Sequence, residues 1–423
     1  MNELNQSTYL NPAFISTYEQ SYGIPGLSNT LAFQFTGFSL GNITDAISSQ
    51  GFFNFTNFYN SINSGIGIKL FTQSDLFHIS RQFGHYQIGL HMSVRSNTET
   101  YFSKDFVGFI AKGNDLYAGQ DVSFSGTKIQ STTYIETGVS VAREFEKFTI
   151  GARFKLLNGI TDITTNSLDV HYLTASNSFD QSTVTLSGSI NSSGLPDPNH
   201  QDTVNGRVNT DTVFSPNNIK PLSNLGFAID LGATYNVTPR LKIAASAIDL
   251  GFINWNNKTY NYNINNVTIN FPGLNTLQLK DSAAKQQFVD SLKNLVKTNT
   301  NRNSYSTMLP SRFILSADYN LSLRDRVGAL FQLQYFMNTF YPSFAFSYSR
   351  KIGTNWRITS NYAIYNNSFT NIGLGTSVKF GAFQFYVMQD DILFYFIPST
   401  MRTLYLRFGC NLVWGERRTR VRI

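Results

Sequence analysis

The feature that most constrains this chain is a strict alternation of apolar and polar residues. Within 84–95 one set of alternate positions is apolar throughout, namely Tyr86, Ile88, Leu90, Met92 and Val94, while the positions between them are polar or glycine. Successive side chains on a β-strand point to opposite faces, so this pattern indicates a strand with one apolar and one polar face. It returns at 147–156, 225–235, 371–380 and 403–414. Such repetition predicts a large antiparallel sheet.

Composition separates a soluble sheet from one that contacts lipid. Aromatic residues make up 15% of the chain and charged residues only 14%, against roughly 25% charged in an average soluble protein. No apolar run reaches the ~18 residues that a spanning helix requires, and the mean hydropathy is −0.17. A closed barrel also satisfies every backbone polar group in lipid. We therefore predict an all-β fold, a transmembrane antiparallel β-barrel of the bacterial outer membrane.

Turn signals give the number of strands. Tight connections are predicted at Glu144–Lys147, Asn236–Pro239, Lys351–Thr354 and Phe380–Ala382, and barrels of this kind have short periplasmic turns. The resulting strand pairs are 74–82 with 84–97, 117–127 with 131–143, 147–160 with 224–236, 239–251 with 308–320, 325–337 with 341–350, 354–365 with 369–380, and 382–391 with 401–414. The sequence thus predicts about fourteen strands, an even number as in most bacterial barrels.

The domain organisation follows from the residues that lie outside these predicted strands. Residues 1–73 are expected to form an N-terminal plug, or hatch, and a first strand at 30–39; 74–414 form the barrel, with long outer loops at 161–223 and 252–307; and 415–423 form a basic periplasmic tail. The second loop is expected to contain a short helix that begins at Asp281 or Ser282 and extends through Val296.

The expectation of a plug rests on space inside the barrel. About eight strands already give an interior that side chains can fill, so fourteen leave room for more chain. Residues 1–29 are expected inside the lumen, with Asn11, Pro12 and Ala13 held against the wall. The aromatic residues Phe52, Phe53, Phe55 and Phe58 also favour a packed plug over a free extension.

Two inward charges are the strongest candidates for a specific contact. Arg153 lies in the middle of its strand and points into the lumen, where an unpaired guanidinium would be costly. Asp230 lies at a similar depth on the strand expected beside it. We expect an Arg153–Asp230 contact that holds wall and plug together rather than binding a substrate.

Enzyme chemistry is not favoured by the remaining polar residues. His78, His85 and His91 accompany many serines, which could suggest a hydrolase or a metal site, but inward polar residues are expected in any polar lumen. The single cysteine, Cys410, excludes a multi-cysteine metal site. We predict no catalytic residue, no metal and no cofactor.

The distribution of charge along the chain limits which classes of partner can be expected. The net charge is +7, but the basic residues are scattered, so nucleic acid is not expected. They concentrate only in the tail, at Arg417, Arg418, Arg420 and Arg422. A solvated tail is the simplest interpretation, and an acidic outer-membrane or periplasmic protein or phospholipid headgroups are the alternative. The other expected partners are the membrane lipids, lipopolysaccharide and phospholipid.

Short sequence stretches also carry a resemblance. They are Tyr9-Leu10-Asn11-Pro12-Ala13-Phe14, Gly23-Ile24-Pro25, Gly151-Ala152-Arg153, Leu156-Leu157-Asn158-Gly159, Asp230-Leu231-Gly232-Ala233, Asp249-Leu250-Gly251-Phe252, Met308-Leu309-Pro310 and Arg407-Phe408-Gly409. In this order the chain resembles a family of outer-membrane proteins known only as a domain of unknown function, and more distantly the FadL-like fatty-acid transporter barrels. That resemblance implies fourteen strands and an N-terminal hatch. Some FadL-like relatives move hydrophobic molecules, and one branch serves type IX secretion as an accessory barrel.

Two functions follow. The first is a plugged barrel that acts as an accessory or anchoring subunit of a larger outer-membrane assembly, favoured by the polar loops and the basic tail. The second is a channel for hydrophobic small molecules, which requires an apolar pocket under the outer loops. Inward-facing Ile248, Ile314 and Leu330 support that pocket. An open aqueous porin is disfavoured because the plug would block it.

Overall fold

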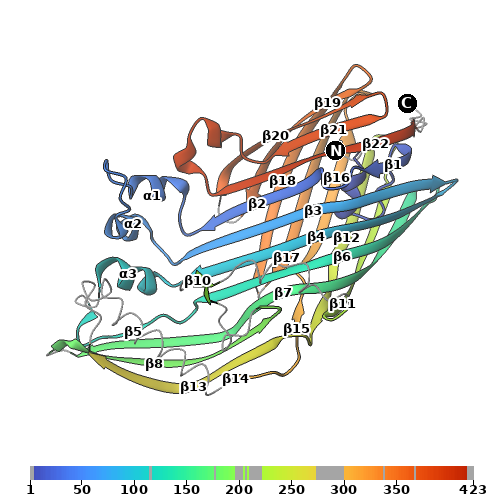
Figure 1. The fold of residues 1–423 in the computed structure, drawn as a ribbon. Coiled ribbons are helices and arrows are strands. Elements are labelled where there is room, and N and C mark those ends of the chain that lie inside the picture. The colour runs from blue at the N-terminus through green and yellow to red at the C-terminus, as the bar shows by residue number, and fades with distance from the viewer. Residues whose placement is uncertain are drawn as a thin grey trace.

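The wall of the molecule is a closed antiparallel barrel of fourteen strands (Figure 1). The computed structural model describes residues 4–113, 117–175, 178–195, 203–204, 207–208, 222–272, 300–336, 339–365 and 368–416. In wall order the strands are β1 (Tyr18–Gly23) with β2 (Ser28–Thr36) as one interrupted strand, β3 (Ile66–Phe83), β4 (Tyr86–Phe102), β6 (Lys128–Glu144), β7 (Phe148–Ala175), β11 (Leu225–Asn236), β12 (Leu241–Trp255), β16 (Ser311–Asn320), β17 (Asp325–Phe336), β18 (Thr339–Ile352), β19 (Trp356–Tyr365), β20 (Ser368–Phe380), β21 (Phe383–Gln389) and β22 (Thr403–Glu416). β1 and β2 pair with both β3 and β22, which closes the barrel.

The alternation places apolar side chains on the outside of this wall. Exposed outward residues include Ile88, Leu90, Val139, Phe154, Phe227, Leu315, Phe346, Leu374 and Phe385. All four predicted tight turns are present, since β6–β7, β11–β12, β18–β19 and β20–β21 are joined by short connections. These turns define the short-turn end of the barrel, and the opposite end is the long-loop end. No helix in the described ranges is long and apolar enough to cross a membrane.

The prediction of one wall strand, at 117–127, was wrong, and a different segment of the chain occupies that place in the count of fourteen. Of residues 117–127 only Asp121–Ser123 forms a strand, β5, which pairs with the far end of β7. Val122 and Phe124 pack against Tyr172 in a cluster beyond the wall, so their alternation reflects packing there and not contact with lipid. β6 pairs directly with β4. The fourteenth strand is instead β1 with β2, interrupted at Gly26, whose φ is +72°.

The N-terminal region divides differently from the prediction. Residues 4–17, including the 3-10 helix η1 (Asn5–Tyr9), precede the first wall strand, and most of their side chains are buried. We call this stretch the N-terminal segment. Residues 18–29, also expected in the lumen, belong to the wall or to the interruption between β1 and β2, because closure of the barrel needs a strand between β3 and β22.

The aromatic residues expected in the plug lie elsewhere. They flank or lie in the short helices α1 (Leu40–Asp45) and α2 (Phe55–Ser61), which stand with α3 (Lys104–Lys112) at the long-loop end (Figure 1). Phe58 packs there with Phe38, Ile62 and Val107, whereas Phe52, Phe53 and Phe55 are exposed.

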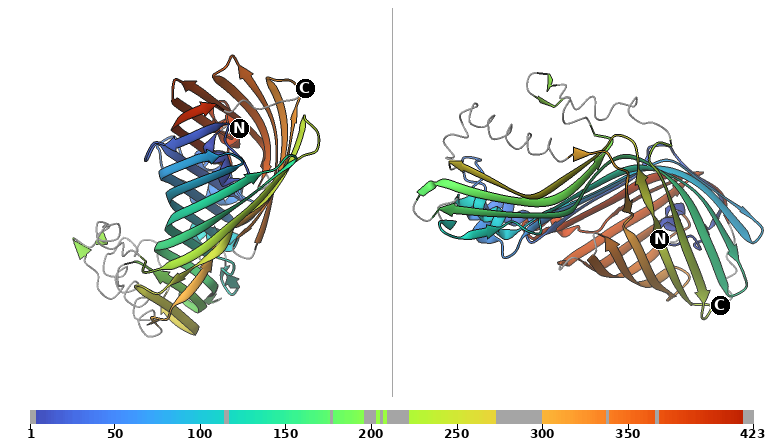
Figure 2. Two further views of the ribbon diagram at one scale, coloured as in Figure 1. Left: turned by 90° about the vertical axis from the view of Figure 1, so that its right-hand side faces the viewer. Right: turned by 90° about the horizontal axis from the view of Figure 1, so that it is seen from below.

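Much of the two expected outer loops is β-structure. β7 runs on to Ala175 and pairs with β8 (Ser178–Ser193), which pairs in turn with β13 (Thr259–Pro272). These strands leave the barrel at the long-loop end as a bent sheet (Figure 2). The remaining short strands are β9 (Thr203–Val204), β10 (Arg207–Val208), β14 (Thr300–Asn301) and β15 (Tyr305–Met308), and two 3-10 helices, η5 (Leu393–Tyr395) and η6 (Pro398–Thr400), connect β21 to β22. The helix expected at 281–296 lies outside the described residues.

Candidate functional site: the barrel lumen

The N-terminal segment is hydrogen-bonded to strands on several sides of the lumen. The side-chain amide of Asn11 donates to the carbonyls of Ala233 at 3.2 Å and Ala245 at 3.0 Å. Ser246 Oγ donates to the Leu10 carbonyl at 2.6 Å. Gln6 exchanges two bonds with Asn411 on β22, at 2.8 and 3.0 Å. The segment is therefore attached to β11, β12 and β22 at once.

Two glycines on neighbouring strands make room for this attachment. Gly151 on β7 pairs with Gly232 on β11. A Cβ at Gly151 would lie 2.4 Å from the Pro12 carbonyl oxygen, and one at Gly232 would lie 2.0 Å from Asn11 Oδ1. Atoms at those distances would overlap, so the wall must lack side chains where Asn11 and Pro12 rest.

Arg153 and Asp230 lie opposite each other on β7 and β11. Arg153 Nη1 is 3.2 Å from Asp230 Oδ2, and the two side chains are 1% and 0% exposed. Asp230 is shared, because Lys155 Nζ lies 2.8 Å from its other oxygen. The contact expected from the sequence is thus present as part of a larger group of charges.

Asp249 is the centre of that group, which we call the lumen charge cluster: Arg95, Glu136, Arg153, Lys155, Asp230, Asp249 and Arg312. Lys155 donates to Asp249 Oδ1. Arg95 Nη1 lies 3.2 Å from the same oxygen, and Arg312 Nη2 lies 2.8 Å from Oδ2. Arg95 also pairs with Glu136 at 3.1 Å. Such mutual compensation is what buried charges require.

A β-bulge brings Asp249 to this position. Ile248 and Asp249 of β12 together oppose the single residue Asp230 of β11, where the pairing register shifts. Asp249 has φ of +61°, and its backbone N–H donates to Asp230 Oδ1 at 2.7 Å. A bulge redirects a side chain locally, so the kink at Asp249 allows it to meet three cations.

Tyr9 connects the N-terminal segment to the charge cluster. Its ring centroid lies 5.2 Å from the Arg153 guanidinium, and its hydroxyl donates to Asp75 at 3.0 Å. Burial raises the pKa of Tyr9 well above its ordinary value, so the phenol stays a neutral donor. The predicted inward histidines His78 and His91 pack around it, with centroids 5.2 and 5.3 Å away.

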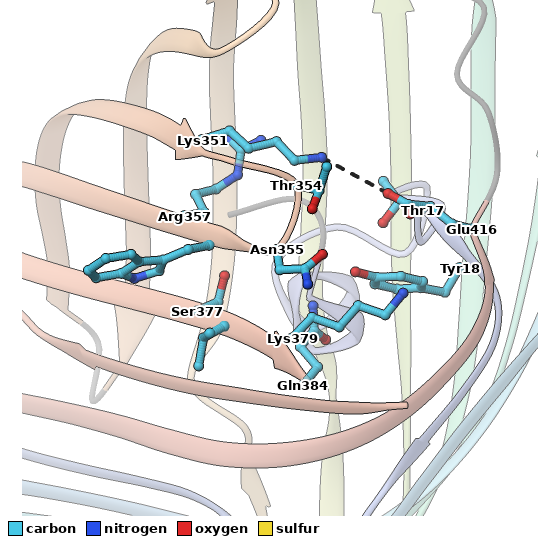
Figure 3. Close-up of a pocket in the computed structure, with 12 residues that line it drawn as sticks. Thr17, Tyr18, Lys351, Thr354, Asn355, Arg357, Ser377, Lys379, Gln384 and Glu416 are labelled. Carbon is cyan, nitrogen blue, oxygen red and sulfur yellow. Dashed lines mark ion pairs between the residues drawn. The ribbon is translucent and has the colours of Figure 1, made fainter. Parts of the chain in front are cut away.

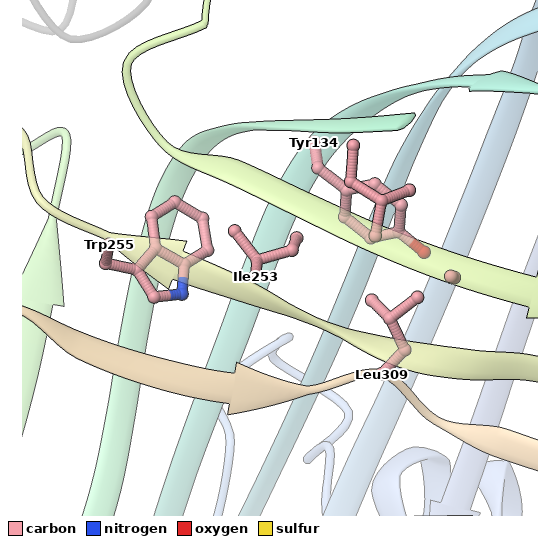
Figure 4. Packing of buried hydrophobic residues seen from close by; sticks show 6 residues of the cluster. Tyr134, Ile253, Trp255 and Leu309 are labelled. Atoms are coloured by element: carbon pink, nitrogen blue, oxygen red, sulfur yellow. The ribbon is translucent and has the colours of Figure 1, made fainter. Parts of the chain in front are cut away.

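An apolar cluster packs against one part of the lumen wall (Figure 4). Its members are Tyr134, Leu157, Ala228, Ile253, Trp255 and Leu309. Trp255 is fully buried and its indole N–H donates to Thr307 at 2.8 Å. The cluster comes from β6, β7, β11 and β12 and the chain just before β16, so side chains occupy the lumen along that part of the wall.

The other side of the lumen holds a cavity of about 850 Å³. The N-terminal segment contributes to its lining through Tyr9, Leu10, Asn11 and Phe14, and its walls come mainly from β2–β4 and β16–β22. The walls carry apolar residues, including Phe71, Ile314, Leu330, Ala363 and Met388, beside polar ones such as Gln73, Gln332 and Asn361. Of the residues expected to form an apolar pocket, Ile314 and Leu330 line the cavity, whereas Ile248 is fully buried.

A smaller and more polar pocket of about 70 Å³ lies near the short-turn end (Figure 3). Lys351 Nζ lies 4.0 Å from Glu416 Oε1. Lys379 Nζ lies 4.8 Å from the ring centroid of Tyr18, and Arg357 donates to Ser349 Oγ at 3.1 Å. These inward cations contact side chains of the barrel wall.

Four of these residues were expected from the sequence. Asn11, Pro12, Arg153 and Asp230 all lie at the facing surfaces of β7, β11 and the N-terminal segment. Asp249 was not predicted as a site residue, although Gly251, two residues farther along β12, was an available signal for irregular backbone. The tail candidates Arg417, Arg418, Arg420 and Arg422 lie outside the described residues.

Comparison with solved structures finds several similar chains, all at low sequence identity. The chain is similar to the toluene transporter TbuX of Ralstonia pickettii (9% identity, 98% of this chain and 95% of that chain, TM-score 0.49). It is also similar to a FadL homologue of Pseudomonas aeruginosa (10%, 98% and 95%, 0.47) and to the toluene transporter TodX of Pseudomonas putida (9%, 98% and 93%, 0.43). Similarities this low carry no conclusion about function.

Sequence comparison identifies the family. No curated protein matches the chain. A family model described as "Family of unknown function (DUF5723)" matches residues 12–390. This match begins in the N-terminal segment, at Pro12, and runs through the barrel as far as the end of β21, well over half of the chain. The chain therefore belongs to this family of unknown function.

Proposed function

We propose that this protein is a channel of the bacterial outer membrane for hydrophobic small molecules. The observation that carries the proposal is the cavity of about 850 Å³ inside the barrel, bounded by the N-terminal segment and lined in part by Phe71, Ile314 and Leu330. Small-molecule sites typically have volumes of about 300–1,000 Å³ and mainly apolar linings with a few polar groups. The cavity has a volume in that range, and apolar residues form a large part of its lining, beside polar and charged ones such as Gln332 and Arg407.

The surroundings of the cavity support the same proposal. The outward belt of Leu, Ile, Val and Phe suits contact with lipopolysaccharide and phospholipid. The short-turn end then faces the periplasm and the long-loop end faces outward. A molecule that enters from outside reaches the cavity before it passes the N-terminal segment. The hydrogen bonds of this segment to the wall strands would have to break or shift for passage.

An accessory or anchoring role ranks second. From the sequence it rested on two polar loops and the basic tail, but the loops contain the strands β8 and β13, and the tail lies outside the described residues. The observation that favours it is the exposure of Phe52 on the α1–α2 connection and of Phe396 at the long-loop end, because exposed aromatic residues suit a partner surface.

Replacing Ile314 by tryptophan is expected to weaken binding of the neutral fluorescent probe N-phenyl-1-naphthylamine by about tenfold or more, equivalent to about 1.4 kcal/mol. The larger side chain would occupy the cavity that Ile314 lines. Titration of the purified barrel in detergent measures the dissociation constant.

Leu315→Trp is the matched control for this experiment. Leu315 is the next residue of β16, points to the outer face and is 56% exposed, so its variant should bind the probe like the parent protein. If neither the parent protein nor the control binds the probe, or if Ile314→Trp binds it unchanged, the cavity is not the ligand site and the channel proposal fails.

A further inference from the structure

Three polar side chains meet across the cavity near the long-loop end. The Tyr341 hydroxyl donates to Glu99 Oε1 at 3.0 Å, and Lys69 Nζ lies 3.3 Å from Glu99 Oε2. Lys69 Nζ also lies 3.0 Å from the centroid of the Tyr341 ring. Each of the three residues thus contacts both of the others.

These residues come from separate parts of the wall. Lys69 and Glu99 are paired neighbours on β3 and β4, whereas Tyr341 is on β18, which pairs with β17 and β19. From β3 the wall passes through β2, β22, β21, β20 and β19 before it reaches β18. The contact therefore joins two wall regions across the lumen, and we call it the cross-lumen bridge.

The bridge lies at the mouth of the cavity. Tyr341 is close to the beginning of β18 and Glu99 is close to the end of β4, and both of those strand ends are at the long-loop end. All three bridge residues line the cavity, as do residues farther along the strands toward the charge cluster, such as Leu330 and Ile314. A molecule that approaches along this part of the wall from the long-loop end reaches the bridge before it reaches them.

The chemistry of the bridge would favour some molecules over others. Its ammonium and carboxylate compensate each other, and their side chains are only 19% and 11% exposed. A charged solute that separated them would have to replace a partly desolvated ion pair, whereas a flat apolar solute could displace or stack on the Tyr341 ring at lower cost.

We propose that Lys69, Glu99 and Tyr341 form the size- and charge-selecting constriction of the channel, an inference that rests on the proposed function. Tyr341 supplies the bulk that narrows the mouth. Glu99 holds the tyrosine hydroxyl and the lysine in place, and Lys69 lies against the ring.

The test measures access to a thiol beyond the bridge in the full-length protein. Leu330→Cys in a Cys410→Ser background introduces that thiol. Leu330 pairs with Ala345, four residues farther along β18 than Tyr341, which corresponds to roughly 13 Å. The labelling rate by a bulky fluorescein maleimide is compared with the rate by a small neutral methanethiosulfonate reagent, in reconstituted vesicles that expose the long-loop end.

Tyr341→Ala is expected to raise the maleimide rate at least tenfold and to change the small-reagent rate much less. Tyr341→Phe, which keeps the ring but cannot donate to Glu99, should lie between Tyr341→Ala and the parent. Glu99→Gln should raise the labelling rate of a cationic reagent less than that of an anionic one. Lys69 keeps its positive charge in this variant, and that charge repels cations and attracts anions. Ser343→Ala, on the same inward face of β18, is the control and should leave all rates unchanged.

Equal rates of maleimide labelling in Tyr341→Ala and the parent protein would overturn the proposed constriction. So would a Ser343→Ala variant that accelerates labelling as much as Tyr341→Ala does. Tyr341→Phe and Glu99→Gln keep the side-chain size, so they test the bridge even if Tyr341→Ala does not fold. The labelling rate requires no transport. If the parent protein binds the probe but the bridge variants leave the labelling rates unchanged, only the proposed constriction is refuted. If the bridge variants change the labelling rates but the parent protein does not bind the probe, the proposed hydrophobic ligand is refuted and the constriction stands.

Discussion

Asp230→Ala is expected to lower the free energy of unfolding of the barrel by about 3–5 kcal/mol, the usual cost of removing one partner from a buried ion pair. Asp230 is fully buried and accepts from Arg153, Lys155 and the backbone N–H of Asp249. Its loss takes one carboxylate partner from each of the cations Arg153 and Lys155, and it leaves the backbone N–H of Asp249 without its acceptor. The midpoint of urea unfolding in lipid vesicles, followed by tryptophan fluorescence, measures the effect.

Arg153→Ala should be less damaging than Asp230→Ala, because Asp230 keeps Lys155 as a partner. The control is Arg350→Ala, which removes the solvent-exposed pair of Arg350 with Asp325 at 3.3 Å and should leave the midpoint unchanged. If Asp230→Ala kept the parental midpoint but lost probe binding, the lumen charge cluster would be a ligand site and its structural role would be refuted.

Gly151→Ala is expected to release the N-terminal segment from the wall and to raise the conductance of the barrel in planar bilayers severalfold. An added Cβ would lie 2.4 Å from the Pro12 carbonyl oxygen and 2.6 Å from the Ala13 nitrogen. Both are backbone atoms, so the clash cannot be relieved by rotating a side chain. Displacement of Pro12 would also strain the bonds of Asn11 to Ala233 and Ala245.

Gly89→Ala is the matched control for this change. Gly89 is also at an inward-facing position, but the only clash of a Cβ there would be with the hydroxyl of Ser140, at 2.5 Å, because the Ile79 carbonyl oxygen lies at an ordinary contact distance of 3.5 Å. The Ser140 side chain can rotate away. Protease cleavage within residues 4–17 should become faster in Gly151→Ala and stay slow in Gly89→Ala. A Gly151→Ala barrel with parental conductance and parental cleavage would show that the segment does not close the lumen.

The local pattern of the sequence predicted a large part of the wall. The alternation that includes Ile150, Ala152 and Phe154 assigned each residue to the lipid or the lumen, and the short turns identified which strands are neighbours. Because β7 and β11 were paired correctly, Arg153 and Asp230 could be expected to meet. The first strand was predicted only at 30–39, which corresponds to β2, and its other half, β1, was missed because the interruption at Gly26 hides the alternation. Residues 117–127, by contrast, show an alternation that serves packing at the long-loop end.

What the sequence determined by itself is the face on which each side chain lies, because the period of two is a property of the extended backbone at every residue. What only the tertiary structure decided is which inward groups meet. Asp249 reaches its three cations through a local kink at a bulge, and Tyr341 reaches Glu99 from a strand 242 residues away in sequence. Such contacts depend on the closure of the barrel and on what fills its lumen, and no local pattern encodes either.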